Sequence, residues 1–431
     1  MHPVILLQRL IQFDTTNPPG NEVECLRFIQ NLLSTAGVDG QVFAKIPDRP
    51  NLIARIRGQG HSPPLLMYGH IDVVTTTLQP WSIPPFEGRI HDGFVWGRGA
   101  LDMKGGIAMM ISAFICAATE REKPHGDIIL LLVCDEEAGG EFGAKFLTEQ
   151  HPDLFTGVRY AIGEFGGFTT TIGRHRFYHI QVAEKQACRI RATLRGPGGH
   201  GSIPVQNGAM AQLGNFLQRL ENIALPVHIT PVVRRMFKTM ASTVGGLKGM
   251  MLTQLLNPYL ADGILRLLGD RGRDCLPLIH NTAIPTILRG GNKINVIPSE
   301  VSVELDGRVL PGYGADDLLQ ELTRLGRKEV EFEIMRFDPG PANPDLGLFH
   351  TLADILHRHD PSGTPVPMLL SGTTDARFFS RLAIQTYGFL PMPFPEDFAF
   401  SRLLHSADER IPVSAMEFGV GAITTLLQHH W

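Results

Sequence analysis

The chain has 431 residues, 43% of them hydrophobic and 19% charged, which is enough for one large core or, more readily, for two domains. A formal net charge of -4, a pI near 6.5 and the lack of any basic run give no electrostatic case for nucleic acid or an acidic membrane surface as a partner. The composition does not exclude small neutral or anionic molecules as partners.

The N-terminal segment and the cysteines are typical of a cytoplasmic protein. The first apolar run, Val4 to Leu7, has only four residues and no cationic segment before it, which predicts an amphipathic helix and no export signal. No uncharged apolar stretch reaches the length of a transmembrane helix. The five cysteines are scattered and form no CxxC pair, as expected for free thiols in a reducing compartment.

Three apolar runs in the first part of the chain each end in residues that can bind a metal. The runs and the residues that follow them are Leu65–Gly69 with His70, Ile128–Cys134 with Asp135, Glu136 and Glu137, and Tyr160–Gly163 with Glu164. Runs without alternation are typical of strands buried on both faces of a parallel sheet. Because ligands of such sheets bind at the carboxyl ends of the strands, we expect these polar side chains to meet at one edge.

The pattern changes after about residue 183. Apolar and polar residues alternate strictly from Cys188 to Arg195, which predicts a half-solvated antiparallel strand, and Val301 to Leu305 predicts a second one. Three short helical patterns occupy the stretch from about 223 to 281. From about 344 the α/β pattern returns, with a strand at Met368–Leu370 and a final helix after Val413.

We therefore predict an α/β catalytic domain with a mixed, largely parallel sheet, formed by residues 1–184 and 341–431. Residues 185–340 form an inserted α+β lid or dimerisation domain with an open antiparallel sheet. Within it, residues from about 223 to 281 are interpreted as a helical insertion.

The residue types at the predicted sheet edge suit two metal ions. Such a site needs ligands for each ion, one carboxylate shared by both ions, and a free base beside the attacking water. Asp102 follows a glycine-rich loop and precedes a helix, so it is the candidate for the shared carboxylate. Glu136 and Glu137 are neighbours whose side chains would diverge in extended backbone, so that one binds metal and the other faces the water.

Two more residues complete this inventory. Asp72 would lie on the same side of an extended segment as His70 and could hold the second nitrogen of its imidazole. His405, far along the chain, would complete the ligands of the second ion. Each of these features alone is more often an ordinary core or surface residue, and it is their conjunction that favours a metal-dependent hydrolase.

Longer motifs around these residues resemble a known family. The motifs are GHIDVV at 69–74, Trp81 with Pro85-Phe86, GRGALDMKGG at 97–106 and DEEAG at 135–139. They are similar to the signatures of the aminoacylase, glutamate carboxypeptidase and succinyl-diaminopimelate desuccinylase family of dinuclear zinc peptidases and deacylases. The resemblance covers nearly the whole chain, and the 223–281 stretch is similar to that of the carboxypeptidase S-like subgroup.

The resemblance implies a role for each candidate residue. His70, Asp102 and Glu164 would hold one zinc ion, and Asp102, Glu137 and His405 the other, with cobalt or manganese as substitutes. Glu136 would be the general base. The family also implies a cis peptide between Asp102 and Met103.

The inserted domain matches the family as well. The segment at 198–204 is similar to the one whose histidine, here His200, reaches toward the transition-state oxyanion, often from the neighbouring subunit of a dimer. Asn295 and Arg308 would bind substrate, the arginine holding a carboxylate, and Gly372 and Thr373 would line the same pocket. The sequence does not decide whether the protein forms a homodimer, because the helical insertion could block the usual dimer contact and leave His200 acting within its own subunit.

Arg308 also has a simpler interpretation as a solvated strand residue, since Ser302, Glu304 and Asp306 share its face. The carboxylate role is favoured because arginine suits bidentate recognition of carboxylates.

We therefore expect metal-dependent hydrolysis of the amide bond of an N-acyl amino acid or small peptide with a free carboxylate, by metal-activated water. Glutamate at position 164, where the family has either Asp or Glu, leans toward N-acyl substrates. An aminopeptidase or dipeptidase of the same fold is an alternative. A metal-binding scaffold without turnover is another alternative. A scaffold would need the metal ligand Glu137 but not the general base Glu136, and the chain has both residues.

Overall fold

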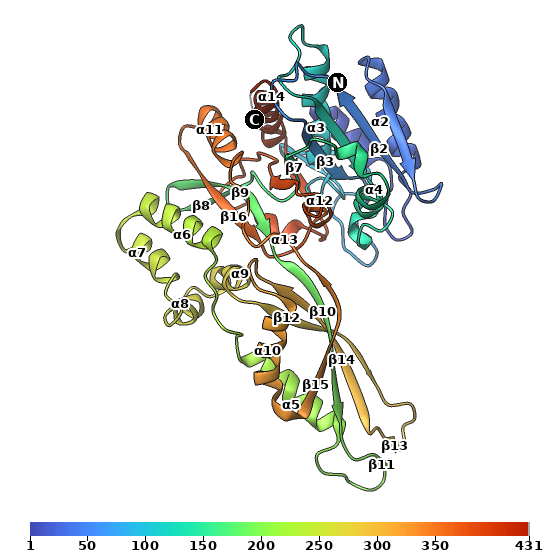
Figure 1. Ribbon diagram of the computed structural model, residues 1–431, viewed down its shortest axis with the longest axis vertical. Helices are drawn as coiled ribbons and strands as arrows, with labels where there is room; N and C mark the ends of the chain where they lie inside the picture. Colours follow the sequence, from blue (N-terminus) through green and yellow to red (C-terminus); the bar gives the residue numbers. More distant parts are fainter. Residues whose placement is uncertain (430–431) are drawn as a thin grey trace. The chain divides into compact units, whose positions relative to one another are not determined.

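The computed structural model describes residues 1–429, and tertiary contacts divide them into two compact units (Figure 1). Unit 1 consists of Met1–Val182, Pro344–Met368 and the chain from Thr374 onward. Unit 2 consists of Ala183–Asn343 and the short piece Leu369–Thr373, whose return to this unit was not predicted. The boundaries drawn from the sequence were after residues 184 and 340.

Unit 1 is built around a nine-stranded sheet with the order β1-β2-β6-β3-β7-β17-β9-β16 and with β8 paired to β9. The centre, β6-β3-β7-β17, is parallel, and the pairs β1-β2, β2-β6 and β17-β9 are antiparallel. The strands are β1 Gly40–Ala44, β2 Pro50–Ile56, β3 Leu65–His70, β6 Ile128–Val133, β7 Tyr160–Gly163, β8 Thr169–Ile172, β9 His175–Glu184, β16 Gly363–Leu370 and β17 Gln385–Gly388.

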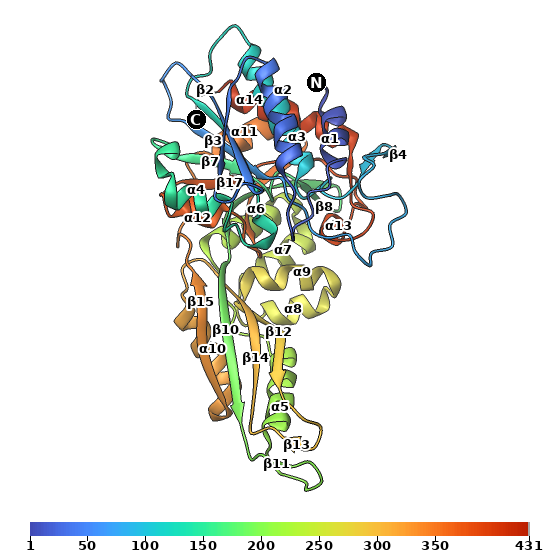
Figure 2. The ribbon, with the colours of Figure 1, turned by 90° about the vertical axis from the view of Figure 1, so that its right-hand side faces the viewer.

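The central strands are buried throughout because helices cover both faces of the sheet. On one face Phe146 of α4 and Phe378 and Phe379 of α12 pack on the apolar side chains of β3 and β6. On the other face α3 contacts both strands and packs against α1 and α14 (Figure 2). The helices of the unit are α1 Pro3–Ile11, α2 Val23–Thr35, α3 Lys104–Thr119, α4 Ala144–Gln150, α11 Phe349–His359, α12 Ala376–Ser380, α13 Phe400–Leu403 and α14 Val413–Leu427.

Shorter elements lie around this sheet. A three-stranded sheet has the order β18-β5-β4, and two short 3-10 helices, η1 and η2, follow β6 and α4. Their bounds are β4 Ile90–His91, β5 Phe94–Trp96, β18 Arg410–Pro412, η1 Glu136–Ala138 and η2 Pro152–Phe155. The mixed sheet with a parallel centre confirms the α/β class predicted from the runs.

Unit 2 contains a four-stranded antiparallel sheet with the order β12-β14-β10-β15. The two central strands, β10 and β14, alternate buried residues with more exposed ones because only one face of the sheet is covered, by α5 and α10 (Figure 1). A separate two-stranded pair, β11-β13, lies beyond the end of β10. The bounds are β10 Gln186–Arg195, β11 Gly199–His200, β12 Thr282–Gly290, β13 Val296–Ile297, β14 Glu300–Val309, β15 Val330–Asp338, α5 Ala209–Asn222, α10 Ala315–Gly326 and η3 Arg327–Glu329.

The stretch from 223 to 281 contains four helices, where the sequence indicated three. They are α6 Pro231–Val244, α7 Gly246–Gln254, α8 Ala261–Leu267 and α9 Asp270–Ile279. The missed helix, α9, contains Gly272 and Pro277, two residues that argue against a helix interior. Among the helices of residues 1–429, none combines the length and apolar character needed to cross a membrane.

Candidate metal centre

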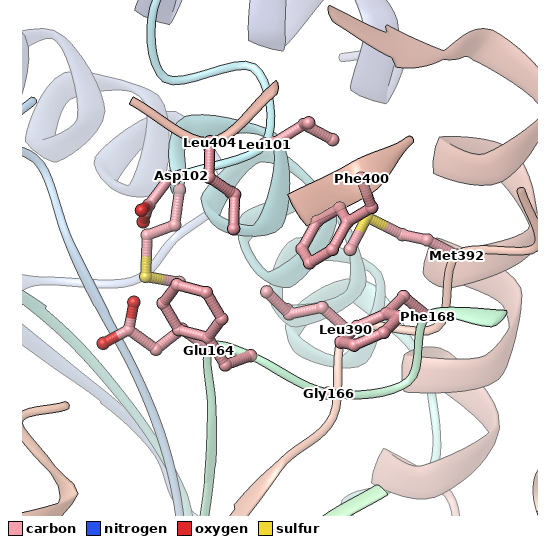
Figure 3. A pocket seen from close by; sticks show the side chains of 11 residues that line it. Leu101, Asp102, Glu164, Gly166, Phe168, Leu390, Met392, Phe400 and Leu404 are labelled. Carbon is pink, nitrogen blue, oxygen red and sulfur yellow. The ribbon is translucent and has the colours of Figure 1, made fainter. Parts of the chain in front are cut away.

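His70 is the last residue of β3, and its imidazole lies next to the carboxylates of Asp102 and Glu164, which are shown in Figure 3. Its Nε2 atom is 3.1 Å from Oδ1 of Asp102 and 3.3 Å from Oε2 of Glu164. Glu164 follows β7, the parallel neighbour of β3, so both residues stand at the carboxyl ends of adjacent strands. The sheet edge therefore brings these residues together as the runs predicted.

Asp102 faces two histidines at once. Its Oδ1 atom lies 3.1 Å from Nε2 of His70, and its Oδ2 atom lies 3.1 Å from Nε2 of His405. The His405 Nε2 atom is also 3.4 Å from Oε2 of Glu137. The carboxylate of Asp102 is thus placed between the two sets of side chains that the resemblance assigned to separate ions. The peptide from Asp102 to Met103 is cis, as expected.

The loop that carries Asp102 is held by Glu409, a residue that the sequence reasoning missed. The buried carboxylate of Glu409 accepts hydrogen bonds from the backbone N–H groups of Gly99, Leu101 and Asp102, at 3.1, 2.7 and 3.0 Å. It also pairs at 2.6 Å with the buried guanidinium of Arg98. Its one sequence signal is its position four residues after His405.

Glu136 and Glu137 lie in the 3-10 turn η1, so the extended backbone assumed for them was wrong. Asp135 before the turn has φ of 71° and Gly139 after it has φ of 112°, and this left-handed backbone at both ends closes the turn directly after β6. The two side chains nevertheless reach different neighbours. Glu136 groups with His70 and Glu164, while Glu137 groups with His70 and Asp102, within 4.8 Å in each case.

Asp72 supports this region differently from the prediction. The Nδ1 atom of His70 is 2.9 Å from the backbone carbonyl of Asp72 and 3.6 Å from its carboxylate Oδ1. The carboxylate instead accepts hydrogen bonds from the backbone N–H groups of Glu136 and Glu137, at 3.2 and 3.1 Å. Asp72 therefore connects the segment after β3 to the turn after β6. The first of these segments follows His70 directly, and the second contains Glu136 and Glu137.

Further buried residues hold Asp72 and Asp135 in place, and no sequence motif indicated them. The side-chain amide of Asn17 donates to Asp72 at 2.8 Å and to Asp135 at 3.2 Å. Arg49 pairs with Glu22 at 3.0 Å and with Asp135 at 3.3 Å. These partners come from the first 50 residues, and only the tertiary fold brings them to this turn.

The charges of the site shift the pKa values of its groups in opposite directions. Burial, followed by the charge of Glu164, raises the pKa of Glu136 well above its ordinary value. Hydrogen bonds to Asp102 and then to Glu137 raise the pKa of His405 to about 10. Burial opposes the ionised form of Asp102, but hydrogen bonds from His405 and His70 outweigh it and lower its pKa. Negative charge is concentrated here, and a bound cation would be stabilised by it.

The donor set fits a metal ion. Neither carboxylate oxygen of Glu164 has a hydrogen-bond partner among the described residues, although Oε2 approaches His70, and the same is true of Oε1 of Glu137. Buried polar atoms are normally paired, and imidazole with carboxylate is a typical set of zinc ligands. Asp375, two residues after Thr373, is also buried and has no hydrogen-bond partner for either carboxylate oxygen among residues 1–429, and burial raises its pKa to about 7.

The predicted substrate-binding residues belong to unit 2. Arg308 on β14 donates to Oγ1 of Thr373 at 2.8 Å and pairs with Asp306 through Nε and Nη2, both at 3.0 Å. Gly372 directly precedes Thr373. His200 and Asn295 lie at the β11-β13 pair, where the N–H of Gly201 donates to the carbonyl of Asn295 at 2.8 Å.

Comparison with known proteins agrees with this geometry. A family model described as Peptidase family M20/M25/M40 matches residues 66–429. The chain belongs to this family. Membership confirms the resemblance drawn from the motifs, and it confirms that the chain is a hydrolase of the metallopeptidase and amidohydrolase class.

Individual members of the family are similar over most of the chain. N-fatty-acyl-amino acid synthase/hydrolase PM20D1 of Homo sapiens is 28% identical over 388 residues, which cover 86% of this chain and 75% of that protein. Carboxypeptidase S-like 2 of Dictyostelium discoideum is 27% identical over 376 residues, covering 81% and 68%. The crystal structure of an M20 family metallo-carboxypeptidase from Sulfolobus solfataricus has a TM-score of 0.71 at 15% identity, covering 99% of each chain. It shows the same fold.

Proposed function

We propose that this protein hydrolyses the amide bond of N-acyl amino acids or small peptides that carry a free carboxylate. Two metal ions would be held, one by His70, Asp102 and Glu164, and the other by Asp102, Glu137 and His405. The observation that carries the proposal is the position of Asp102, whose two carboxylate oxygens each lie 3.1 Å from a different imidazole. Hydrolysis of N-acyl amino acids and carboxypeptidase activity are also named for the relatives.

Bound zinc, or cobalt or manganese in its place, would polarise the scissile carbonyl and activate the attacking water. Glu136 takes a proton from that water and delivers it to the leaving amine, a role that suits a buried carboxylate whose pKa is raised. Asp72 keeps Glu136 and Glu137 in place through their backbone N–H groups. His200 would donate a hydrogen bond to the developing oxyanion.

Arg308 would hold the carboxylate of the amino-acid half of the substrate. Its Nε and Nη2 atoms are occupied by Asp306, so an incoming carboxylate would replace Asp306 or use the N–H groups that point toward Thr373. Asn295, Gly372 and Thr373 complete the proposed substrate-binding residues. Arginine suits this task because its planar group makes paired hydrogen bonds to carboxylates.

His200 would act on the substrate of a second subunit. In unit 2, Arg308 lies near one end of the β10-β14 pair, opposite Ala187, whereas His200 follows the other end, beyond Arg195 and its partner Glu300. The eight residue-to-residue steps from Glu300 to Arg308 span about 26 Å. One subunit therefore cannot place both side chains on one small substrate, which supports a homodimer.

A cytoplasmic location is proposed on the cysteines. All five cysteines are free thiols, which agrees with a reducing compartment. They are Cys25, Cys116, Cys134, Cys188 and Cys275.

A substrate panel with controlled metal content tests the function. Exhaustive chelation, checked by elemental analysis, should abolish cleavage of N-acyl amino acids, and zinc, cobalt or manganese should restore it. Arg308→Ala should lower kcat/KM by about 30-fold or more for free acids and have little effect on the matching amides, because a buried carboxylate loses its partner. Full turnover without metal contradicts the mechanism. Equal wild-type cleavage of acid and amide, with a need for a free amino terminus, would instead identify an aminopeptidase.

A further inference from the structure

The helical insertion of unit 2 carries a charge opposite to that of the whole chain. Residues 231–269, which contain α6, α7 and α8, have five lysines and arginines against one acidic residue, Asp262. The net charge of this segment is therefore +4, whereas that of the whole chain is -4. All the basic residues except Arg235 are exposed; the set is Arg234, Arg235, Lys238, Lys248 and Arg266.

The same segment exposes large apolar side chains. Tyr259 is 95% exposed, Leu267 78% and Leu247 69%, and Met250 and Leu260 are exposed as well. All five lie between positions 247 and 267, on α7, on α8 and on the loop that joins them. Apolar side chains normally occur singly on a protein surface, so this concentration indicates a contact surface.

The exposed apolar side chains are not the ones that hold the insertion together. α6 packs against α7, α7 contacts α8, and α8 packs against α9 (Figure 1). The helices use other apolar side chains for this packing, which are buried: Val233, Met236, Phe237, Met240, Leu255, Ala261 and Leu265. The insertion is therefore folded with a core of its own, and its exposed leucines and tyrosine are left for another partner.

Basic and apolar side chains lie next to one another on the exposed surface. Lys248 follows Leu247 on α7, and Arg266 precedes Leu267 on α8. Helices that lie in the surface of an anionic membrane combine leucine and aromatic residues with lysine and arginine in this way. An exposed tyrosine also suits the boundary between lipid and water, because its ring is apolar and its hydroxyl is polar.

We propose that this surface, formed by α7 and α8 with the basic residues of α6, docks the protein on an anionic phospholipid membrane. The apolar side chains enter the headgroup boundary, and the lysines and arginines are attracted by the anionic headgroups. A second copy of this chain is a poorer occupant, because a two-fold symmetric contact through this surface would bring two positive segments together.

This docking goes beyond the proposed function and revises one sequence prediction. The charge of the whole chain argued against an acidic membrane surface, but it conceals the positive charge of this one segment. A peripheral contact agrees with the proposed cytoplasmic location, since the cytoplasmic leaflet contains the anionic lipids.

Sedimentation of the full chain with lipid vesicles tests the proposal. The protein should bind vesicles of two parts phosphatidylcholine and one part phosphatidylserine, and should bind pure phosphatidylcholine vesicles at least about tenfold more weakly. Added salt should weaken binding to the mixed vesicles, because it screens exposed charges. The measurement needs neither metal nor substrate, so its result is independent of the proposed function.

The charge contribution is tested by a triple variant with Lys238→Gln, Lys248→Gln and Arg266→Gln. Its binding to the mixed vesicles should fall by about 100-fold, because each basic residue near such a surface contributes about fivefold. The control removes the same charge outside the insertion, with glutamine at three other exposed basic residues, and should bind as the wild type does. Its residues are Arg121, Lys123 and Lys328.

The apolar contribution is tested by single variants at exposed leucines. Leu247→Ser and Leu267→Ser should each weaken binding to the mixed vesicles by about tenfold or more, because a buried leucine contact with lipid is lost. Leu78→Ser is the control, since Leu78 is fully exposed in unit 1 and should not touch the membrane.

The other outcomes contradict the proposal. If the wild type does not bind the mixed vesicles, the membrane is excluded and an acidic protein becomes the better occupant. Equal binding to both kinds of vesicle, or equal losses in the two triple variants, would show that this surface does not recognise anionic lipid. If sedimentation velocity shows that Leu247→Ser and Leu267→Ser dissociate an oligomer while vesicle binding is unchanged, the surface joins copies of the chain and the proposal is wrong.

Discussion

Glu136 and Glu137 are adjacent in one turn, yet their surroundings differ. Glu137 lies against His405 and Asp102, whereas Glu136 is grouped with Glu164 and His70. Burial raises the pKa of both carboxyl groups, and that of Glu136 is raised well above its ordinary value. Glu136→Gln should lower kcat by roughly 10² to 10⁴ while two metals stay bound, because a base is lost and no ligand is removed. Glu137→Gln should instead reduce the metal content measured by elemental analysis. The opposite pattern would reverse the two roles.

Lys185 is a buried lysine between β9 and β10 that donates to the carbonyl of His280 at 2.9 Å and to Thr282 Oγ1 at 3.0 Å. Burial, followed by the charge of Arg308, lowers its pKa to about 7, and Glu321 opposes this shift. Between about pH 7 and the ordinary lysine pKa of about 10.5, the unfolded chain binds a proton that the folded chain does not, so stability rises with pH.

The free energy of unfolding should therefore increase from pH 7 to pH 10, by at most on the order of 4–5 kcal/mol. Urea unfolding at several pH values measures it. Lys185→Met should remove this part of the pH dependence, and Lys238→Met, at an exposed lysine of α6, is the control. An unchanged slope in Lys185→Met would show that the lysine is charged in the folded protein at pH 7.

At the scale of elements, the loop from Gly97 to Asp102 depends on β18, which pairs with β5 and places Glu409 under the loop. Glu409→Gln puts an amide N–H group among backbone donors and leaves the buried Arg98 without its charged partner. We expect a loss of about 3–5 kcal/mol in stability together with a lower metal content. Glu417→Gln, at an exposed glutamate of α14, is the control. A variant that is destabilised but keeps full metal content would show that Glu409 supports the fold and not Asp102.

The elements that could be predicted from the sequence are those whose signal is local. The apolar runs predicted β3, β6 and β7 because burial on both faces leaves no polar positions, and the carboxyl-end rule placed His70 and Glu164 on one edge. The prediction of extended backbone at Glu136 was wrong because a 3-10 turn has no periodic pattern in the sequence. Arg49 and Glu409 were not predicted, because they reach Asp135 and the Asp102 loop across 86 and 307 positions of sequence, respectively. The roles of the site residues stay predictions.

At the scale of the whole molecule, the question is whether catalysis needs two subunits. A mixture of inactive His200→Ala and inactive Glu136→Gln protein should recover up to about a quarter of the wild-type activity, because half of the dimers are mixed and one of their two sites is intact. The exposed edge strand β12, with Ile284 59% and Leu288 60% exposed, is the expected contact. Leu288→Lys in both proteins should abolish the recovery, and Leu267→Lys in α8 should not. No recovery at any protein concentration would mean that each subunit is self-contained.

The bond between Asp102 and Glu409 joins residues 307 positions apart. A ribosome that adds about 5–20 residues per second needs roughly 15–60 s to travel from one to the other. Once residue 164 has been added, the nascent chain has His70, Asp102, Glu136 and Glu164 but still lacks both the acceptor that holds the Asp102 loop and the imidazole of His405. The proposed metal centre is thus complete only near the end of synthesis, and we expect a chain interrupted before residue 405 to lack amidase activity.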